Sequence, residues 1–300
     1  WSSDVCSSDL GVLLMQLENI SKTIDKKEIL TNISITVEPG EIVGLIGPNG
    51  AGKTTTMKIM SGLIVNFQGK VVGQERIGVL IDGPKYFPNR TARENLNYFR
   101  ALSKESYSVD YVESLFDMKN YGKKKVKDFS LGMKQRLGMA LALINKNELL
   151  ILDEPMNGLD PDGVQATIQT LKHLAKELHI GIVISSHILG DLDKLCDRAY
   201  FIKNGAIIQT VTLGKEVSVY QFTFDEENED KVSEISALFD GVEQRHPLWL
   251  ISEADYPLFL KELVLNDIIP LEMKKHALNL EDVYFSLVEG EDRKSTRLNS

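Results

Sequence analysis

The chain has 300 residues, of which 43% are hydrophobic and 26% charged, and its formal net charge is −9. This length predicts one large domain and a smaller accessory domain. The acidic balance argues against a general nucleic-acid binder, so we expect no nucleic-acid partner. No apolar run approaches the roughly 18–20 residues that a membrane-spanning helix needs. Cys6 and Cys196 have neither metal-ligand nor redox spacing.

The two ends of the sequence share one DNA segment. Residues 292–300 can be encoded by GATCGGAAGAGCACACGTCTGAACTCC, and the opposite strand, with one T in front, encodes residues 1–9. That DNA resembles a sequencing-library adapter read as coding sequence; a pair of natural serine-rich tails is the alternative. We therefore assign residues 1–10 and 292–300 to the adapter and expect the native start near Leu14 or Met15.

Short apolar runs and turn signals predict the elements of the first domain. EPGE at 38–41 indicates a hairpin turn leading into a buried strand at 42–47, and a helix is predicted over 53–63. ELLILDEP (148–155) and IGIVISSH (180–187) indicate apolar strands that end in polar residues. Buried strands alternating with helices predict an α/β domain over 14–213 with a mainly parallel core sheet, whose ligands bind at the carboxyl ends of the strands.

The pattern changes near residues 211–215. From there to residue 288 it predicts strand, helix, two short strands, helix, strand and a last helix over 279–288. This order indicates a small α+β accessory domain over 214–290, ferredoxin-like in its arrangement.

GPNGAGKTT at 47–55 satisfies the pattern of a phosphate-binding loop between a strand and a helix. Glycines let the backbone N–H groups point at phosphate oxygens, while Lys53 reaches the β- and γ-phosphates and Thr54 offers its hydroxyl to Mg²⁺. An ordinary glycine-rich turn is the alternative. The loop predicts a nucleotide-phosphate site.

Asp153 and Glu154 end a predicted buried strand. One carboxylate there can hold Mg²⁺ through water, and the next can orient or deprotonate an attacking water, which favours hydrolysis over transfer to a substrate. The alternatives are a structural acid pair and, for His187 at the end of the other strand, a structural histidine.

Together with FSLGMKQR (129–136) and NGLDP (157–161), these motifs resemble the ATP-binding cassette ATPases over roughly 15–213. The resemblance implies a P-loop fold with an antiparallel β subdomain and a helical subdomain, and ATP and Mg²⁺ as cofactors. It implies Mg²⁺ handling by Thr54 and Asp153, catalysis by Glu154, γ-phosphate sensing by His187 and cross-subunit contact by Asp160. The nucleotide-binding residues that it implies are Gly47, Asn49, Gly50, Ala51, Gly52, Lys53, Thr54 and Thr55.

In that family the signature segment, Leu-Ser-Gly-Gly-Gln, closes over the ATP of a second subunit. FSLGM keeps Ser130 and Gly132 but replaces a glycine by Leu131 and the glutamine by Met133. A serine hydroxyl and N–H groups at a helix start suit a γ-phosphate. We therefore expect Ser130, Gly132 and Met133 to form a working signature; a decayed one is the alternative, which the intact Glu154 and His187 disfavour.

Two further positions depart from the family. Ile24 stands where an aromatic residue usually stacks on adenine, so stacking there is either replaced by apolar contact or abandoned. Asp82 stands at the glutamine loop; a carboxylate can accept a hydrogen bond from the attacking water or approach Mg²⁺, which makes it a candidate catalytic and metal residue, or it simply lines a loop.

IGVLIDGPKYFPNRTARENL (77–96) resembles the bacitracin-resistance and lantibiotic-immunity branch of bacterial export cassettes. This implies the ATP-hydrolysing subunit of an exporter whose cargo is an antimicrobial peptide or a peptide antibiotic. The subunit would lie on the cytoplasmic face of the membrane and work with a second cassette, in a homodimer or heterodimer, and with separate transmembrane permeases. Residues 82–102 would meet the permease. The alternatives are a soluble cassette ATPase in translation or DNA maintenance, a regulatory cassette without ATPase activity, and an exporter of unrelated cargo.

Overall fold

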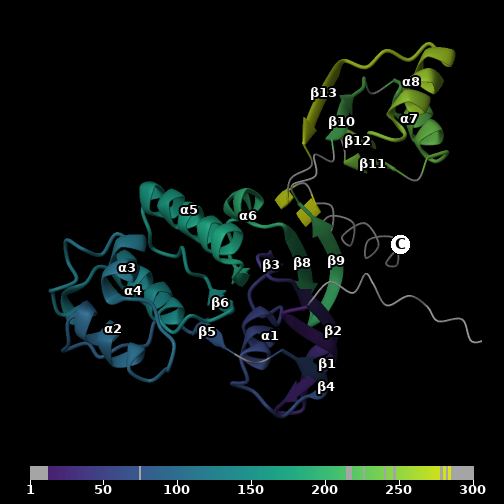
Figure 1. Cartoon of the computed structure of the whole chain (residues 1–300). Coiled ribbons are helices and arrows are strands. Elements are labelled where there is room, and N and C mark those ends of the chain that lie inside the picture. The colour runs from purple at the N-terminus through teal and green to yellow at the C-terminus, as the bar shows by residue number, and fades with distance from the viewer. Residues whose placement is uncertain are drawn as a thin grey trace, which may run out of the picture. The chain divides into compact units, whose positions relative to one another are not determined.

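The computed structural model describes residues 13–73, 76–213, 218–225, 227–239, 241–245, 248–277, 280–281 and 283–284. The segments assigned to the adapter, 1–10 and 292–300, lie outside the described residues. The chain divides into two compact units, Trp1–Leu213 and Gly214–Ser300 (Figure 1). Each unit has its own apolar core.

A six-stranded sheet with the order β5-β6-β7-β3-β8-β9 forms the centre of the first unit. Strands β5 to β8 and β3 run parallel, and β9 pairs antiparallel with β8. Strands β3 and β7 are buried along their whole length, as expected for a parallel sheet covered on both faces. The strands are β3 (Ile42–Ile46), β5 (Ile77–Leu80), β6 (Leu149–Asp153), β7 (Gly181–Ser185), β8 (Arg198–Lys203) and β9 (Ala206–Thr212).

A three-stranded antiparallel sheet lies beside the central one and contains β1 (Met15–Ile24), β2 (Lys27–Val37) and β4 (Gln68–Val72) in the order β2-β1-β4. The predicted hairpin at 38–41 is therefore wrong, because this turn joins β2 and β3, which belong to different sheets. The reason is burial: β3 is apolar on both faces and takes a central place, whereas β2 exposes alternate side chains.

Helices cover the central sheet and form a separate group at its β5 edge (Figure 1). Helix α1 ends three residues before the predicted end, where Gly62 takes φ +73°. The parallel core, the antiparallel sheet and the helical group together confirm the predicted fold class. The helices are α1 (Lys53–Met60), α2 (Ala92–Arg100), α3 (Val109–Leu115), the short 3₁₀ turn Val126–Asp128, α4 (Leu131–Leu143), α5 (Pro161–Leu178) and α6 (Leu189–Leu195).

The second unit is an antiparallel sheet packed against two helices. The strand order is β11-β12-β10-β13, and Phe222, Trp249 and Phe259 fill the core between sheet and helices. The order of elements, β-α-β-β-α-β, is that of a ferredoxin-like arrangement. The predicted last helix over 279–288 falls largely outside the described residues. The elements are β10 (Ser218–Thr223), α7 (Glu229–Ser236), β11 (Val242–Arg245), β12 (Leu248–Ser252), α8 (Tyr256–Leu265) and β13 (Glu272–Ala277).

Candidate active site

Three neighbouring parallel strands bring the predicted site residues together. Strand β7 lies between β6 and β3, and Ser185 of β7 is in register with Asp153 of β6 and with Leu45 of β3. The carboxyl ends of these strands therefore meet at one edge of the sheet. The phosphate loop follows β3, the acid pair ends β6 and His187 follows β7.

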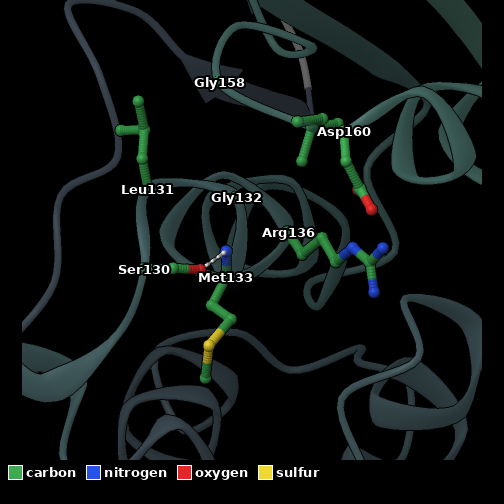
Figure 2. Close-up of a pocket in the computed structure, with 8 residues that line it drawn as sticks. Ser130, Leu131, Gly132, Met133, Arg136, Gly158 and Asp160 are labelled. Carbon is green, nitrogen blue, oxygen red and sulfur yellow. Dashed lines mark hydrogen bonds between the residues drawn. The ribbon is translucent and has the colours of Figure 1, made fainter.

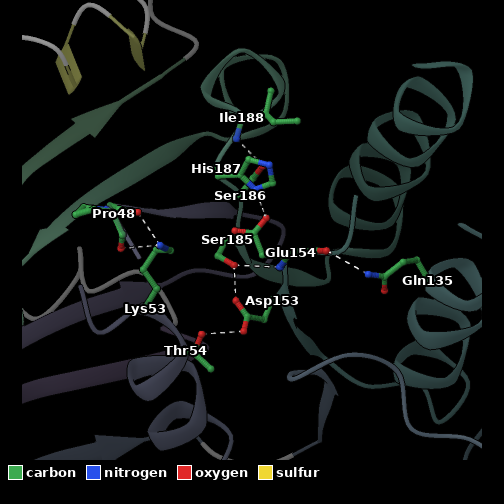
Figure 3. A network of polar contacts seen from close by, with 11 residues as sticks. Pro48, Lys53, Thr54, Gln135, Asp153, Glu154, Ser185, Ser186, His187 and Ile188 are labelled. Atoms are coloured by element: carbon green, nitrogen blue, oxygen red, sulfur yellow. Dashed lines mark hydrogen bonds and ion pairs between the residues drawn. The ribbon is translucent and has the colours of Figure 1, made fainter. Parts of the chain in front are cut away.

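The phosphate loop is closed by its own lysine. Lys53 Nζ donates hydrogen bonds to the carbonyl oxygens of Gly47 at 2.6 Å and of Pro48 at 3.2 Å (Figure 3). Burial lowers the pKa of the Lys53 ammonium, and the nearby carboxylates of Glu154 and Asp153 oppose this shift. Gly52 has φ +110°, and a Cβ at that position would lie 2.5 Å from Leu30 Cδ2, so only glycine fits.

A hollow of about 410 Å³ lies over this loop. Ile24 is not among the residues that line it; this side chain, at the end of β1, is 41% exposed. Lys27 and Ile29 of β2 line the hollow instead, although the sequence did not single them out. The position of Lys27 could have been inferred from that of Ile24, because the two residues pair directly across the β1–β2 hairpin and their side chains share one face of the sheet. The lining residues are Lys27, Ile29, Asn49, Gly50, Ala51, Gly52, Lys53, Thr54, Thr55, Asp153 and Glu154.

Hydrogen bonds connect the loop to the acid pair. Asp153 accepts from Thr54 Oγ1 at 2.9 Å through Oδ2 and from Ser185 Oγ at 2.6 Å through Oδ1 (Figure 3). Ser185 is fully buried, and its Oγ also accepts from the Glu154 backbone N–H at 3.0 Å. One hydroxyl thus fixes both acids. The sequence contained Ser185 but offered no pattern that assigned it a role.

Glu154 is held in a strained conformation beside the histidine. Its φ is +50°, a region that costs a non-glycine residue energy and that clusters at functional sites. Its carboxylate Oε2 lies 2.8 Å from His187 Nδ1. The structure therefore unites Lys53, Thr54, Asp153, Glu154 and His187, and leaves the Glu154 side chain 30% exposed beside the hollow.

Asp82 does not join this group. Its carboxylate forms an ion pair with Lys58 of α1 at 2.6 Å, is 55% exposed and does not line the hollow over the phosphate loop. Asp82 has φ +55°, directly after β5 and Ile81. The side chain is thus bound to α1 in this structure, and the role of Asp82 in acting on the attacking water or on Mg²⁺ stays a prediction.

The residues of the predicted signature line a second hollow of about 350 Å³, which we call the signature hollow (Figure 2). Ser130 caps α4 by accepting from the Met133 N–H at 3.3 Å, and Asp160 caps α5 by accepting from the Gly163 N–H at 3.2 Å. The two hollows share no lining residue. The residues that line the second are Ser130, Leu131, Gly132, Met133, Arg136, Gly158, Leu159 and Asp160.

The altered signature letter Leu131 has a structural counterpart. A Cβ on Gly158 would lie 2.2 Å from Leu131 Cδ2, and Gly158 has φ +77°. The leucine side chain thus occupies space that only a glycine at 158 leaves free. The side chain of Leu131 is nevertheless 55% exposed, so part of its apolar surface faces solvent.

A phosphate loop joined to an acid pair and a histidine at the edge of a parallel sheet defines a nucleoside-triphosphate hydrolase. The family model described as ABC transporter matches residues 30–157. YcbN of Bacillus subtilis strain 168, an ABC transporter ATP-binding protein, is 33% identical over 92% of this chain and 97% of its own length. The chain therefore belongs to the ATP-binding proteins of ABC transporters, which confirms the family inferred from the motifs and disfavours a role in translation or DNA maintenance.

Other relatives are named as ATP-binding proteins for the transport of peptide antibiotics. The lantibiotic transport ATP-binding protein SrtF of Streptococcus pyogenes is 40% identical over 65% of this chain and 89% of its own length. The bacitracin transport ATP-binding protein BcrA of Bacillus licheniformis is 37% identical over 66% of this chain and 69% of its own length. A solved ATP-binding subunit of an ABC transporter matches with a TM-score of 0.61 and 26% identity over 67% of this chain and 90% of its own.

These relationships establish the general mode of action. The chain is an ABC ATPase that binds ATP, and ATPases of this family work as dimers with transmembrane subunits. Within the described residues, the structure contains no helix that is both long and apolar enough to span a bilayer.

Proposed function

We propose that this chain is the ATP-hydrolysing subunit of a bacterial exporter whose cargo is an antimicrobial peptide or a peptide antibiotic. The similarity to SrtF and BcrA supports this cargo class, and export of unrelated cargo is the alternative. The observation that carries the hydrolytic part is the contact between Glu154 and His187 beside the phosphate loop.

The described residues suggest how each group acts on ATP. Lys53 neutralises the β- and γ-phosphates, and in doing so exchanges its bonds to Gly47 and Pro48 for phosphate oxygens. Glu154 orients the attacking water and takes its proton, because its carboxylate borders the hollow and no metal ligand role competes for it. His187 holds that carboxylate through Nδ1 and contacts the γ-phosphate with the other ring nitrogen.

A magnesium ion fits the donor set at this site. The Thr54 hydroxyl and the Asp153 carboxylate lie 2.9 Å apart, and both offer the oxygen atoms that Mg²⁺ prefers. The described residues include no cluster of three or more His, Cys, Asp or Glu side chains suited to a metal, so the ion would share its coordination with ATP and water. When bound, Mg²⁺ would neutralise phosphate charge.

A second subunit would complete the site. The signature hollow shares no residue with the hollow over the phosphate loop, so Ser130 and Gly132 would contact the γ-phosphate of ATP on a partner, with Met133 beside them. Asp160 would make the cross-subunit contact beside them. Because one chain carries both kinds of surface, a homodimer suffices.

We infer that residues 82–102 meet the transmembrane subunit, which would keep the chain on the cytoplasmic face of the membrane. A hollow of about 480 Å³ in this segment is lined by Phe87, Arg90, Glu94, Asn97 and Tyr98. Phe87 and Tyr98 are 44% and 52% exposed, and their rings meet edge to face at 4.9 Å. Exposed aromatic rings beside charged groups suit an amphipathic helix of a partner.

The test of the hydrolytic role is Glu154→Gln, with Glu148→Gln as the matched control at the other end of β6. Glu148 pairs with Arg76 at 2.5 Å and is remote from the hollow. Glu154→Gln should lower kcat by at least about 100-fold, since general-base catalysis contributes that much, while ATP still binds and drives dimerisation measured by light scattering. Normal turnover in Glu154→Gln would remove Glu154 from this role.

The cargo class is tested in a bacterial host that carries this chain and its transmembrane partner. Introducing Glu154→Gln there should lower the concentration of bacitracin or of a lantibiotic that inhibits growth. If ATPase activity is lost and susceptibility to both peptides is unchanged, the exporter carries unrelated cargo.

A further inference from the structure

A buried amide connects the signature helix to the acid proposed as the general base. Gln135 lies on α4, is 7% exposed and donates a hydrogen bond from Nε2 to the backbone carbonyl oxygen of Glu154 at 3.4 Å (Figure 3). The bond is at the long end of the range for hydrogen bonds. Gln135 has no role among those that the family resemblance implies.

The other end of this amide is unsatisfied. Gln135 Oε1 is buried and has no hydrogen-bond partner among the described residues. A buried acceptor without a partner destabilises a folded protein, and an apolar side chain of equal length would avoid that penalty. The Glu154 carbonyl does not depend on Gln135 either, because it also accepts from the Asn157 N–H at 3.2 Å. Folding stability therefore does not explain a glutamine here.

The hydrogen bonds of the Glu154 peptide groups better explain the presence of a glutamine at position 135. With φ at +50°, Glu154 is held in its conformation by its surroundings: Ser185 binds its N–H at 3.0 Å, and Gln135 binds its carbonyl oxygen. We propose that Gln135 is a positioning residue that fixes the Glu154 backbone so that the carboxylate stays against His187 and the attacking water. This rests on the proposed role of Glu154 in hydrolysis.

Because Gln135 lies on α4, its hydrogen bond to Glu154 also connects that helix to the proposed general base. The hydroxyl of Ser130 caps the start of α4, and Ser130 lines the signature hollow. The amide thus joins the helix that would meet a partner's ATP to the carboxylate that acts on this chain's own ATP. In a dimer, this hydrogen bond would connect the two ATP sites within each chain, together with the packing of Leu131 against Gly158.

The test is Gln135→Met in the full-length chain, since methionine has similar length and no polar atom. We expect kcat to fall about 3- to 10-fold, as expected for one hydrogen bond to a neutral group. The KM for ATP and the affinity for ATP should stay within twofold of wild type, and the melting temperature should be equal or higher.

The matched control is Asn145→Leu, which removes a second buried and unsatisfied amide oxygen beyond the far end of α4. It should leave kcat unchanged. Wild-type kcat in Gln135→Met would overturn the proposal, and so would a loss of kcat accompanied by a drop in melting temperature of several degrees. If instead wild-type turnover proves independent of Glu154, measured separately with Glu154→Gln, the proposed function fails.

Discussion

Removing the hydroxyl of Ser185 should destabilise the first unit and its chemistry together. In Ser185→Ala, Asp153 Oδ1 loses a donor at 2.6 Å, and the Glu154 N–H loses its acceptor at 3.0 Å. A hydrogen bond to a charged group contributes about 1.5–3 kcal/mol, and a buried donor left without a partner costs about 1–3 kcal/mol. Because Asp153 is half-buried and water can replace part of the lost bond, we expect a net loss of about 2–4 kcal/mol in the free energy of unfolding.

Such a loss is a large fraction of the roughly 5–15 kcal/mol that stabilises a typical domain. Urea unfolding followed by circular dichroism measures it in the first unit. Tryptophan fluorescence serves as an internal reference, because Trp249 lies in the core of the second unit and the other tryptophan is Trp1. The fluorescence transition should stay unchanged. The kcat for ATP should also fall, because both acids lose their common anchor.

Ser186→Ala is the matched control for this substitution. Among the hydrogen bonds of the described residues, Ser186 Oγ accepts only from the Ile188 N–H at 3.0 Å and bonds to neither acid. Its replacement should cost about 1 kcal/mol and leave kcat nearly unchanged. If Ser185→Ala and Ser186→Ala have equal effects on stability and kcat, Ser185 does not organise the acid pair.

Two further substitutions test the remaining groups. Ser130→Asp preserves a side-chain oxygen that caps α4 but places a negative charge in the signature hollow. Cooperative ATPase activity should therefore be lost, while the melting temperature and ATP binding to the phosphate loop are retained. Unchanged turnover would show that this segment is not a signature. Lys53→Met should abolish the rise in melting temperature that ATP produces. Burial lowers the pKa of Lys53 below 10.5, so the unfolded chain binds more protons than the folded chain as the pH approaches 10.5. The stability of wild type should therefore rise relative to that of Lys53→Met between pH 7 and pH 9.5. Melting temperatures of both proteins at both pH values check the sign, and a fall in the melting temperature of wild type relative to that of Lys53→Met from pH 7 to pH 9.5 would contradict it.

The local motifs could be read from the sequence because backbone geometry requires them. A loop that wraps a phosphate needs glycine at Gly52, whose φ is +110°, and a fully buried parallel strand needs an unbroken apolar run such as β6 or β7. These constraints act within a few residues. They sufficed for the phosphate loop, for the acid pair and for the fold class.

Contacts between distant segments were decided only by the tertiary structure. Thr54 meets Asp153, and Gln135 meets Glu154, because the strand order places β7 between β3 and β6 and packs α4 beside them. The same packing seats Asp82 on Lys58 rather than at the hollow, and brings Lys27 to the hollow instead of Ile24.

The turn at 38–41 illustrates the difference most clearly. Its proline and glycine predict a turn, and the structure has a turn there, in which the Glu41 N–H donates to the Glu38 carbonyl oxygen at 3.2 Å. Whether a turn closes a hairpin depends on which sheet each flanking strand joins. Strand β2 joins the three-stranded sheet and β3 the six-stranded sheet, and no local pattern specifies that pairing. Residue types alone thus determined which chemical groups this protein carries, whereas burial of apolar strands decided which of those groups meet.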